Sequence, residues 1–248
     1  MQLFGLFAVT AYCIVSLIIG ARLLRLARRT RELPELLFGA AFLFGGMIGY
    51  PASVASRILA AGAPTTARVM IVLSLIGLAS SSVCLLLVWW RIYHPTRRWA
   101  PWLVSVWTAL LAGVLAIRVF EPAPGSSAVV SDPSYLLMLI AQGGVYAANM
   151  GSSLRYHGLL RRRLRLGLAD PVVANRILLW GLAAMAITAQ YSYALAVPLL
   201  AGSAGVAAAQ PAVTGVLGLS AAATIWLTFF PPRAYRRAIE RRAARQAG

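Results

Sequence analysis

Residues 3–21 read LFGLFAVTAYCIVSLIIGA, and residues 22–31, which follow directly, read RLLRLARRTR. The first segment is long and apolar enough to cross a bilayer as a helix, which takes roughly 20 such residues. The second segment holds five arginines, which keep its end of the helix at one membrane surface. Comparable apolar runs follow at residues 36–58, 69–90, 101–120, 135–155, 174–199 and 212–230. The sequence therefore predicts an all-α membrane protein, a bundle of seven transmembrane helices.

The basic residues are distributed unevenly between the two sides of this predicted bundle. The chain has no lysine. All but three of its 23 arginines lie in or directly beside the gaps after the first, third, fifth and seventh runs, and the exceptions are Arg57, Arg68 and Arg118. Basic residues in short loops stay on the cytoplasmic side of a membrane. We therefore expect the N-terminus outside and the C-terminus in the cytoplasm.

We expect one membrane domain over residues 1–230 and a basic tail over residues 231–248. Pro231 and Pro232 interrupt the last helix, and Tyr235, Ala238 and Ile239 then recur with Arg242 on one helical face. This pattern predicts a short amphipathic helix on the inner leaflet, with a disordered basic tail as the alternative. The lack of lysine and the abundance of alanine are typical of GC-rich bacterial genes, so we expect a bacterial inner membrane protein.

The net charge of +17 does not indicate nucleic-acid binding in this chain. The arginines lie beside apolar runs, at the depth where anionic lipid head groups sit. Orientation of the helices and contact with anionic lipids therefore explain the charge. A docking surface for an acidic cytoplasmic protein is the alternative interpretation.

The chemistry-bearing side chains do not form a catalytic or metal-binding pattern. The six carboxylates all lie at the ends of apolar runs or in the gaps, and no His, Cys, Asp or Glu residues have metal-ligand spacing. No phosphate-binding glycine loop or serine-hydrolase motif is present. We therefore expect neither an enzyme nor a bound cofactor.

The predicted outline of seven helices with an external N-terminus resembles that of the microbial rhodopsins. Members of that family hold retinal on a lysine of their last helix. Residues 212–230, which form the last run here, contain no amine. Covalently bound retinal is therefore excluded.

A stripe of small residues marks the second run. Ala41, Gly45, Gly49 and Ser53 recur every four residues, so they share one helical face that another helix backbone can approach closely. The partner is either another helix of the same chain or the same helix of a second copy in a homodimer. Pro51 should also kink this helix, because proline removes a backbone hydrogen bond.

A second stripe, of neutral polar residues, marks the fifth run. Gln142, Tyr146, Asn149 and Ser153 lie at i, i+4, i+7 and i+11 and must face protein or water rather than lipid. We expect a ligand pocket where this stripe meets polar and aromatic residues of the second and sixth runs, namely Tyr50, Thr188, Gln190, Tyr191 and Tyr193. Hydrogen bonding that only holds the helices together is the alternative.

These features favour a receptor-like or sensory bundle. A small neutral or lipid-like ligand would bind in an outward-facing pocket, and the basic inner surface would act on a separate cytoplasmic protein partner. A facilitative carrier of a small uncharged solute would use the same pocket. An accessory protein that assembles with other membrane proteins through the second run is the third interpretation.

Overall fold

The computed structural model describes residues 2–120, 133–200 and 203–247. Almost all of these residues are helical, and the part of the chain so described contains no strand. The prediction of an all-α protein is confirmed. The elements are α1 (Gln2–Thr30), α2 (Leu33–Phe42), a π-helical segment η1 (Leu43–Gly49), α3 (Tyr50–Leu59), α4 (Pro64–Tyr93), α5 (Trp99–Phe120), α6 (Pro133–Leu164), α7 (Pro171–Leu200), α8 (Ser203–Phe229) and α9 (Arg233–Ala247).

Prolines lie at several of the helix starts. α4, α6 and α7 each begin at a proline. Proline lacks a backbone N–H, and at the first turn this costs no hydrogen bond, because the N–H groups there have no partner within the helix. α2 has Pro34 at its first turn for the same reason. After Pro231 and Pro232, a helix forms over Arg233–Ala247, as the amphipathic pattern predicted.

Six stretches of the described helices are long and apolar enough to cross a membrane: Val9–Thr30, Leu33–Leu59, Pro64–Tyr93, Trp99–Phe120, Pro171–Ala196 and Ala212–Phe229. The predicted run at residues 135–155 is not among them. It lies within α6, whose apolar character is interrupted by the predicted polar stripe and by several glycines. The integral membrane character is therefore supported by six helices rather than by the seven predicted.

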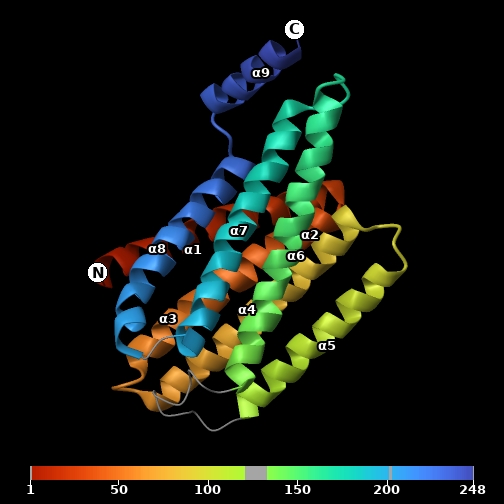
Figure 1. Ribbon diagram of the computed structural model, residues 1–248. Helices are drawn as coiled ribbons and strands as arrows, with labels where there is room; N and C mark the ends of the chain where they lie inside the picture. Colours follow the sequence, from red (N-terminus) through yellow and green to blue (C-terminus); the bar gives the residue numbers. More distant parts are fainter. Residues whose placement is uncertain (1, 121–132, 201–202, 248) are drawn as a thin grey trace.

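Within the bundle, α6 packs most extensively on α7 and also contacts α4 and α5 (Figure 1). α1 packs on α2 and α8, and α5 lies at the edge against α4 and α6. The interior is filled by side chains from several of these helices, of which the largest fully buried apolar ones are Ile19, Val88, Val145 and Ile225. α6 therefore packs against three other helices, and one of its faces is buried.

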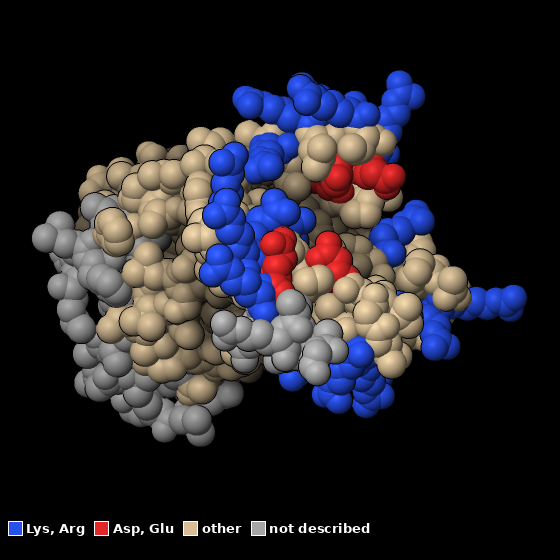
Figure 2. Space-filling view, turned by 90° about the horizontal axis from the view of Figure 1, so that it is seen from above, with Lys and Arg blue, Asp and Glu red and all other residues tan. Residues whose placement is uncertain are grey.

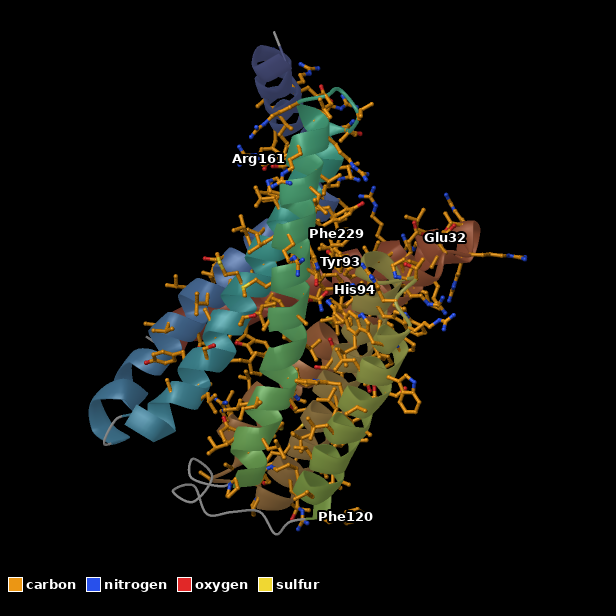
Figure 3. The ribbon with its side chains drawn as sticks, turned by 45° about the vertical axis from the view of Figure 1, so that its right-hand side comes forward. Glu32, Tyr93, His94, Phe120, Arg161 and Phe229 are labelled. Atoms are coloured by element: carbon orange, nitrogen blue, oxygen red, sulfur yellow. The ribbon has the colours of Figure 1, made fainter. Side chains whose placement is uncertain are left out.

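Many arginines gather on the face at one end of the bundle, which we call the basic end (Figure 2). It is the end at which α4, α6 and α8 finish and α7 begins, with α9 beyond it (Figure 1). Figure 3 places Phe120, the last residue of α5, at the opposite end.

The small-residue stripe is covered by α4 of the same chain. The Ser81 hydroxyl of α4 donates a hydrogen bond of 2.9 Å to the Ala41 carbonyl. A Cβ added at Gly45 would lie 2.7 Å from the Ser81 oxygen, and one at Gly49 would lie 2.8 Å from Leu78. This packing favours the intramolecular interpretation of the stripe.

The expected irregularity near Pro51 takes the form of the π-helical segment η1, which ends two residues before it. The N–H of Tyr50 bonds to the Gly45 carbonyl, five residues back, instead of the usual four. Such a wide turn relieves the clash of a proline ring with the preceding helical turn. η1 contacts both α1 and α4, so the irregular segment lies inside the bundle.

Replacing Gly77 with alanine should destabilise the bundle. A Cβ at Gly77 would lie 2.7 Å from the Gly49 nitrogen and 2.8 Å from the Phe44 carbonyl oxygen, and neither backbone atom can move aside easily. We expect the free energy of unfolding, measured by SDS titration in bicelles, to fall by about 1–3 kcal/mol. Gly113→Ala is the matched control, because its Cβ would meet nothing within 4 Å. Equal stability of the two variants would contradict the close approach of α4 and η1.

Candidate functional site

The polar stripe of α6 faces the interior, as predicted. Gln142 is 2 % exposed, and Asn149 and Ser153 are fully buried. Tyr146 is also buried and lies between them and Gln142 on the same face. Two of these side chains bond to neighbouring helices, because Gln142 contacts Tyr191 of α7 and Ser153 contacts Tyr93 of α4.

Four tyrosines meet beside this stripe, and together with Gln142 and Gln190 we call them the tyrosine–glutamine cluster. The rings of Tyr146 and Tyr191 stack with centroids 5.7 Å apart and an interplanar angle of 21°. Tyr12 and Tyr50 meet edge to face with centroids 5.6 Å apart. The two pairs lie near one another, since Tyr12 interacts electrostatically with both Tyr146 and Tyr191.

Hydrogen bonds connect this cluster across the bundle. The Tyr191 hydroxyl donates to Oε1 of Gln142 over 2.8 Å, which joins α7 to α6. The hydroxyl of Tyr50 reaches the side chain of Gln190, and that of Tyr146 reaches Ser81 on α4. Side chains from α1, α3, α4, α6 and α7 therefore converge at one place.

Not every residue predicted for the pocket joins this cluster. Thr188 donates its hydroxyl to the Ala184 carbonyl of its own helix over 2.8 Å. Asn149 donates from Nδ2 to the Val145 carbonyl over 2.9 Å, while its buried Oδ1 has no hydrogen-bond partner.

Tyr12 belongs to the cluster, although the sequence did not indicate it as a site residue. Its signal was a hydroxyl-bearing ring within the otherwise apolar first run, but nothing in that run indicated which helix the ring would meet. Tyr12 contacts the cluster because α1 packs beside η1 and α3.

Gln142 also lines a small cavity on the side of α6 that faces α4 and α5. The cavity that Gln142 lines has a volume of about 10 Å³, and its other walls are apolar side chains of α4, α5 and α6: Leu75, Ala79, Leu111, Val114, Leu115 and Met138. That volume holds about one water molecule. A larger ligand at Gln142 would have to displace a side chain, such as that of Tyr191, which bonds to Gln142 and stacks on Tyr146.

A second group of polar contacts lies nearer the basic end. Trp89 Nε1 donates to the Ser152 hydroxyl and the Tyr93 hydroxyl bonds to that of Ser153, each over 2.7 Å. The His94 ring lies between Trp89 and Trp99, with centroids 4.5 and 5.1 Å away. Burial and the charges of Arg97 and Arg155 lower the pKa of His94. These contacts align the end of α4 with the middle of α6.

Among the residues that the structure describes, no three His, Cys, Asp or Glu side chains gather as metal ligands would. Comparison with protein-family models, with curated proteins and with solved structures found no match to this chain. The geometry of the tyrosine–glutamine cluster is therefore the basis for the functional proposal below.

Replacing Tyr191 with phenylalanine should weaken the bundle slightly without changing its packing. The ring still stacks on Tyr146, but Gln142 loses the donor to its Oε1. Hydrogen bonds between membrane helices contribute about 1 kcal/mol, and we expect a loss of that size in the free energy of unfolding in bicelles.

The matched control for this variant is Ser220→Ala. The Ser220 hydroxyl is exposed and bonds only within its own helix, to the Val216 carbonyl. We expect its removal to change stability by less than about 0.5 kcal/mol. A Tyr191→Phe variant as stable as this control would show that the bond between Tyr191 and Gln142 contributes nothing.

Proposed function

We propose that this protein is a receptor-like bundle of the bacterial inner membrane. In this proposal the chain crosses the bilayer seven times, with the N-terminus outside. A small uncharged ligand binds at the tyrosine–glutamine cluster, and the basic end signals to a separate cytoplasmic protein. The contact of Tyr191 with both Gln142 and Tyr146 is the observation that carries the proposal.

The length and surroundings of α6 support a seventh crossing. α6 has 32 residues, or about 48 Å of helix, more than the roughly 30 Å of a hydrocarbon core. Its amides and hydroxyls are buried against α4 and α7 rather than exposed to lipid. A helix that is too polar to cross a bilayer alone can cross it when neighbouring helices shield its polar side chains from lipid. The gathering of arginines at the basic end supports the orientation (Figure 2).

The chemistry of the cluster supports an uncharged aromatic or hydroxyl-bearing ligand. The described residues of the cluster carry phenol and amide groups and no carboxylate or amine. A ligand with a ring and a hydroxyl can replace both interactions of Tyr191, the stack on Tyr146 and the bond to Gln142. Charged ligands would lack a counter-charge at this depth.

The position of the cluster next to the π-helical segment η1 supports a signalling role. Tyr50 directly follows η1, and η1 contacts α1 and α4. π-helical turns often occur at functional sites because their backbone is less tightly paired. Displacement of Tyr191 would change the contacts of Gln190 and Tyr50 and could thus shift the helices on both sides of η1.

The carrier interpretation makes use of the same stripe. From Gln142 to Ser153 the stripe runs about 16 Å along α6, half of a hydrocarbon core. A carrier would release the ligand at the basic end, so flux of the ligand into proteoliposomes would favour it over a receptor. The accessory interpretation requires neither ligand binding nor flux.

We expect an uncharged phenol-like compound to raise the thermal unfolding temperature of the full-length protein in nanodiscs. The probes are phenol, p-cresol and indole, which offer a ring with one donor. Gln142→Leu and Tyr146→Leu should each abolish this stabilisation while leaving membrane insertion intact, because they remove the bonding and stacking partners of the ligand.

Trp107→Phe is the control for this experiment. It removes a hydrogen bond of 2.8 Å from Trp107 to the Ala141 carbonyl, next to the cluster but outside it. Ligand-dependent stabilisation should persist in this variant even if the basal stability falls. The proposal is wrong if none of the probes stabilises the unmodified protein, or if both leucine variants respond as the unmodified protein does.

A further inference from the structure

Two helices extend beyond the rest of the bundle at the basic end. The last residue of α4, Tyr93, bonds to Ser153, but α6 continues to Leu164. Figure 3 shows Tyr93, His94 and Phe229 near one level and Arg161 well beyond them. Eleven residues of helix past Ser153 extend about 16 Å. We use the name basic hairpin for residues 155–176, which comprise the end of α6, the turn that follows it and the start of α7.

The basic hairpin is a defined structure rather than a loose loop. Gly167 has a φ of 67°, and the Leu168 N–H bonds back to the Arg163 carbonyl over 2.9 Å, which closes α6 in a Schellman-type cap. Asp170 accepts a 2.7 Å hydrogen bond from the Val172 N–H and caps α7.

Contacts between its two helices hold the hairpin together beyond the bundle. Nδ1 of His157 lies 2.9 Å from the Ala174 carbonyl oxygen, and Leu160 and Ala174 are buried between the helices. α9 is attached to the same structure, because Nδ2 of Asn175 donates to the Tyr235 hydroxyl over 3.0 Å. The hairpin and α9 therefore form one surface (Figure 1).

This surface carries a dense positive charge with few carboxylates near it. Exposed arginines of the hairpin and of α9 contribute to it, among them Arg161, Arg162, Arg163, Arg165, Arg236 and Arg237. The acidic residues of the hairpin and α9 are Asp170, which caps α7, and Glu240. The charge is thus available to a partner of opposite sign.

The same surface exposes large apolar side chains. Leu166 and Leu168, in the turn, are 71 % and 72 % exposed, and Leu159 on α6 is 53 % exposed. Leucines at such a site contact either lipid or a protein. The head-group layer is about 5–8 Å thick on each side of the hydrocarbon core, and the turn lies about 16 Å beyond the level of Tyr93. The distance favours a protein.

We propose that the basic hairpin and α9 form a docking surface for an acidic amphipathic helix of a separate soluble protein. Leucine-type residues of that helix would cover Leu159, Leu166 and Leu168, and its carboxylates would pair with the surrounding arginines. This inference deepens the proposed function by giving the partner a chemical class. It needs no ligand at the tyrosine–glutamine cluster, so the two can fail separately.

The test uses the full-length protein in nanodiscs of uncharged phosphatidylcholine. The probe is a fluorescent synthetic helix with leucines at i, i+3, i+4 and i+7 and glutamates elsewhere, and its binding is followed by anisotropy. A scrambled peptide of equal composition controls for net charge. We expect the amphipathic peptide to bind at least about tenfold more tightly than the scrambled one, because only it can bury leucines together with ion pairing.

Two sets of variants locate the binding site. The double variant Leu166→Ser and Leu168→Ser should weaken binding at least about tenfold, since it removes the apolar contact. The triple variant Arg161→Gln, Arg162→Gln and Arg165→Gln should weaken it similarly. The matched triple variant at the end of α1, Arg25→Gln, Arg28→Gln and Arg29→Gln, changes the net charge equally and should leave affinity within about twofold.

Three results would overturn the inference: equal binding of both peptides, equal loss in both triple variants, or full binding by the serine variant. A spin label on Leu166→Cys, in a chain lacking Cys13 and Cys84, addresses the membrane alternative. Protection of this label from aqueous quenchers in vesicles with phosphatidylglycerol would show a lipid contact and would also overturn it. The phenol-dependent thermal shift, measured in the same nanodiscs, would be unaffected by any of these failures.

Discussion

Polar side chains of α6 bond to neighbouring helices, and the arrangement of the bundle depends on the burial of these amides and hydroxyls. An unsatisfied polar group in lipid costs several kcal/mol. Gln142 is satisfied by Tyr191 of α7, and Ser153 by Tyr93 of α4. α6 therefore has to lie between α4 and α7, whereas the apolar α5 lies at the edge, where Trp102 and Phe120 are exposed.

The close packing of α4 against η1 serves the same polar network. Gly77 lets the backbones of α4 and η1 meet, which places Ser81 where it bonds to the Ala41 carbonyl and reaches Tyr146. The Ser81 hydroxyl thus contacts both the small-residue stripe, at Ala41, and the polar stripe, at Tyr146. The π-helical turn before Pro51 also brings Tyr50 to Tyr12 and Gln190. The irregular backbone and the tyrosine–glutamine cluster are parts of one structure.

Sequence patterns that act within one helix predicted the structure well. The apolar run at 101–120 corresponds to α5 at Trp99–Phe120, since hydrophobic length is a local signal. The burial of Gln142 and Asn149 also followed from their spacing on α6. The contacts of Tyr12 and the stacking of Tyr191 on Tyr146 depend on neighbours far away in sequence, which helical periodicity does not identify. The wide turn of η1 was expected only as a kink at Pro51.

Crossing of the bilayer by α6 is the central claim, because the orientation and the ligand site both depend on it. Single cysteines at Ser134 and Gly158, near its two ends, can be introduced into a chain lacking Cys13 and Cys84. Labelling of intact cells with a membrane-impermeant maleimide then reports the side on which each lies. We predict labelling at position 134 and none at 158 until the membrane is permeabilised. Labelling of both positions in intact cells, or of neither before permeabilisation, would contradict the account.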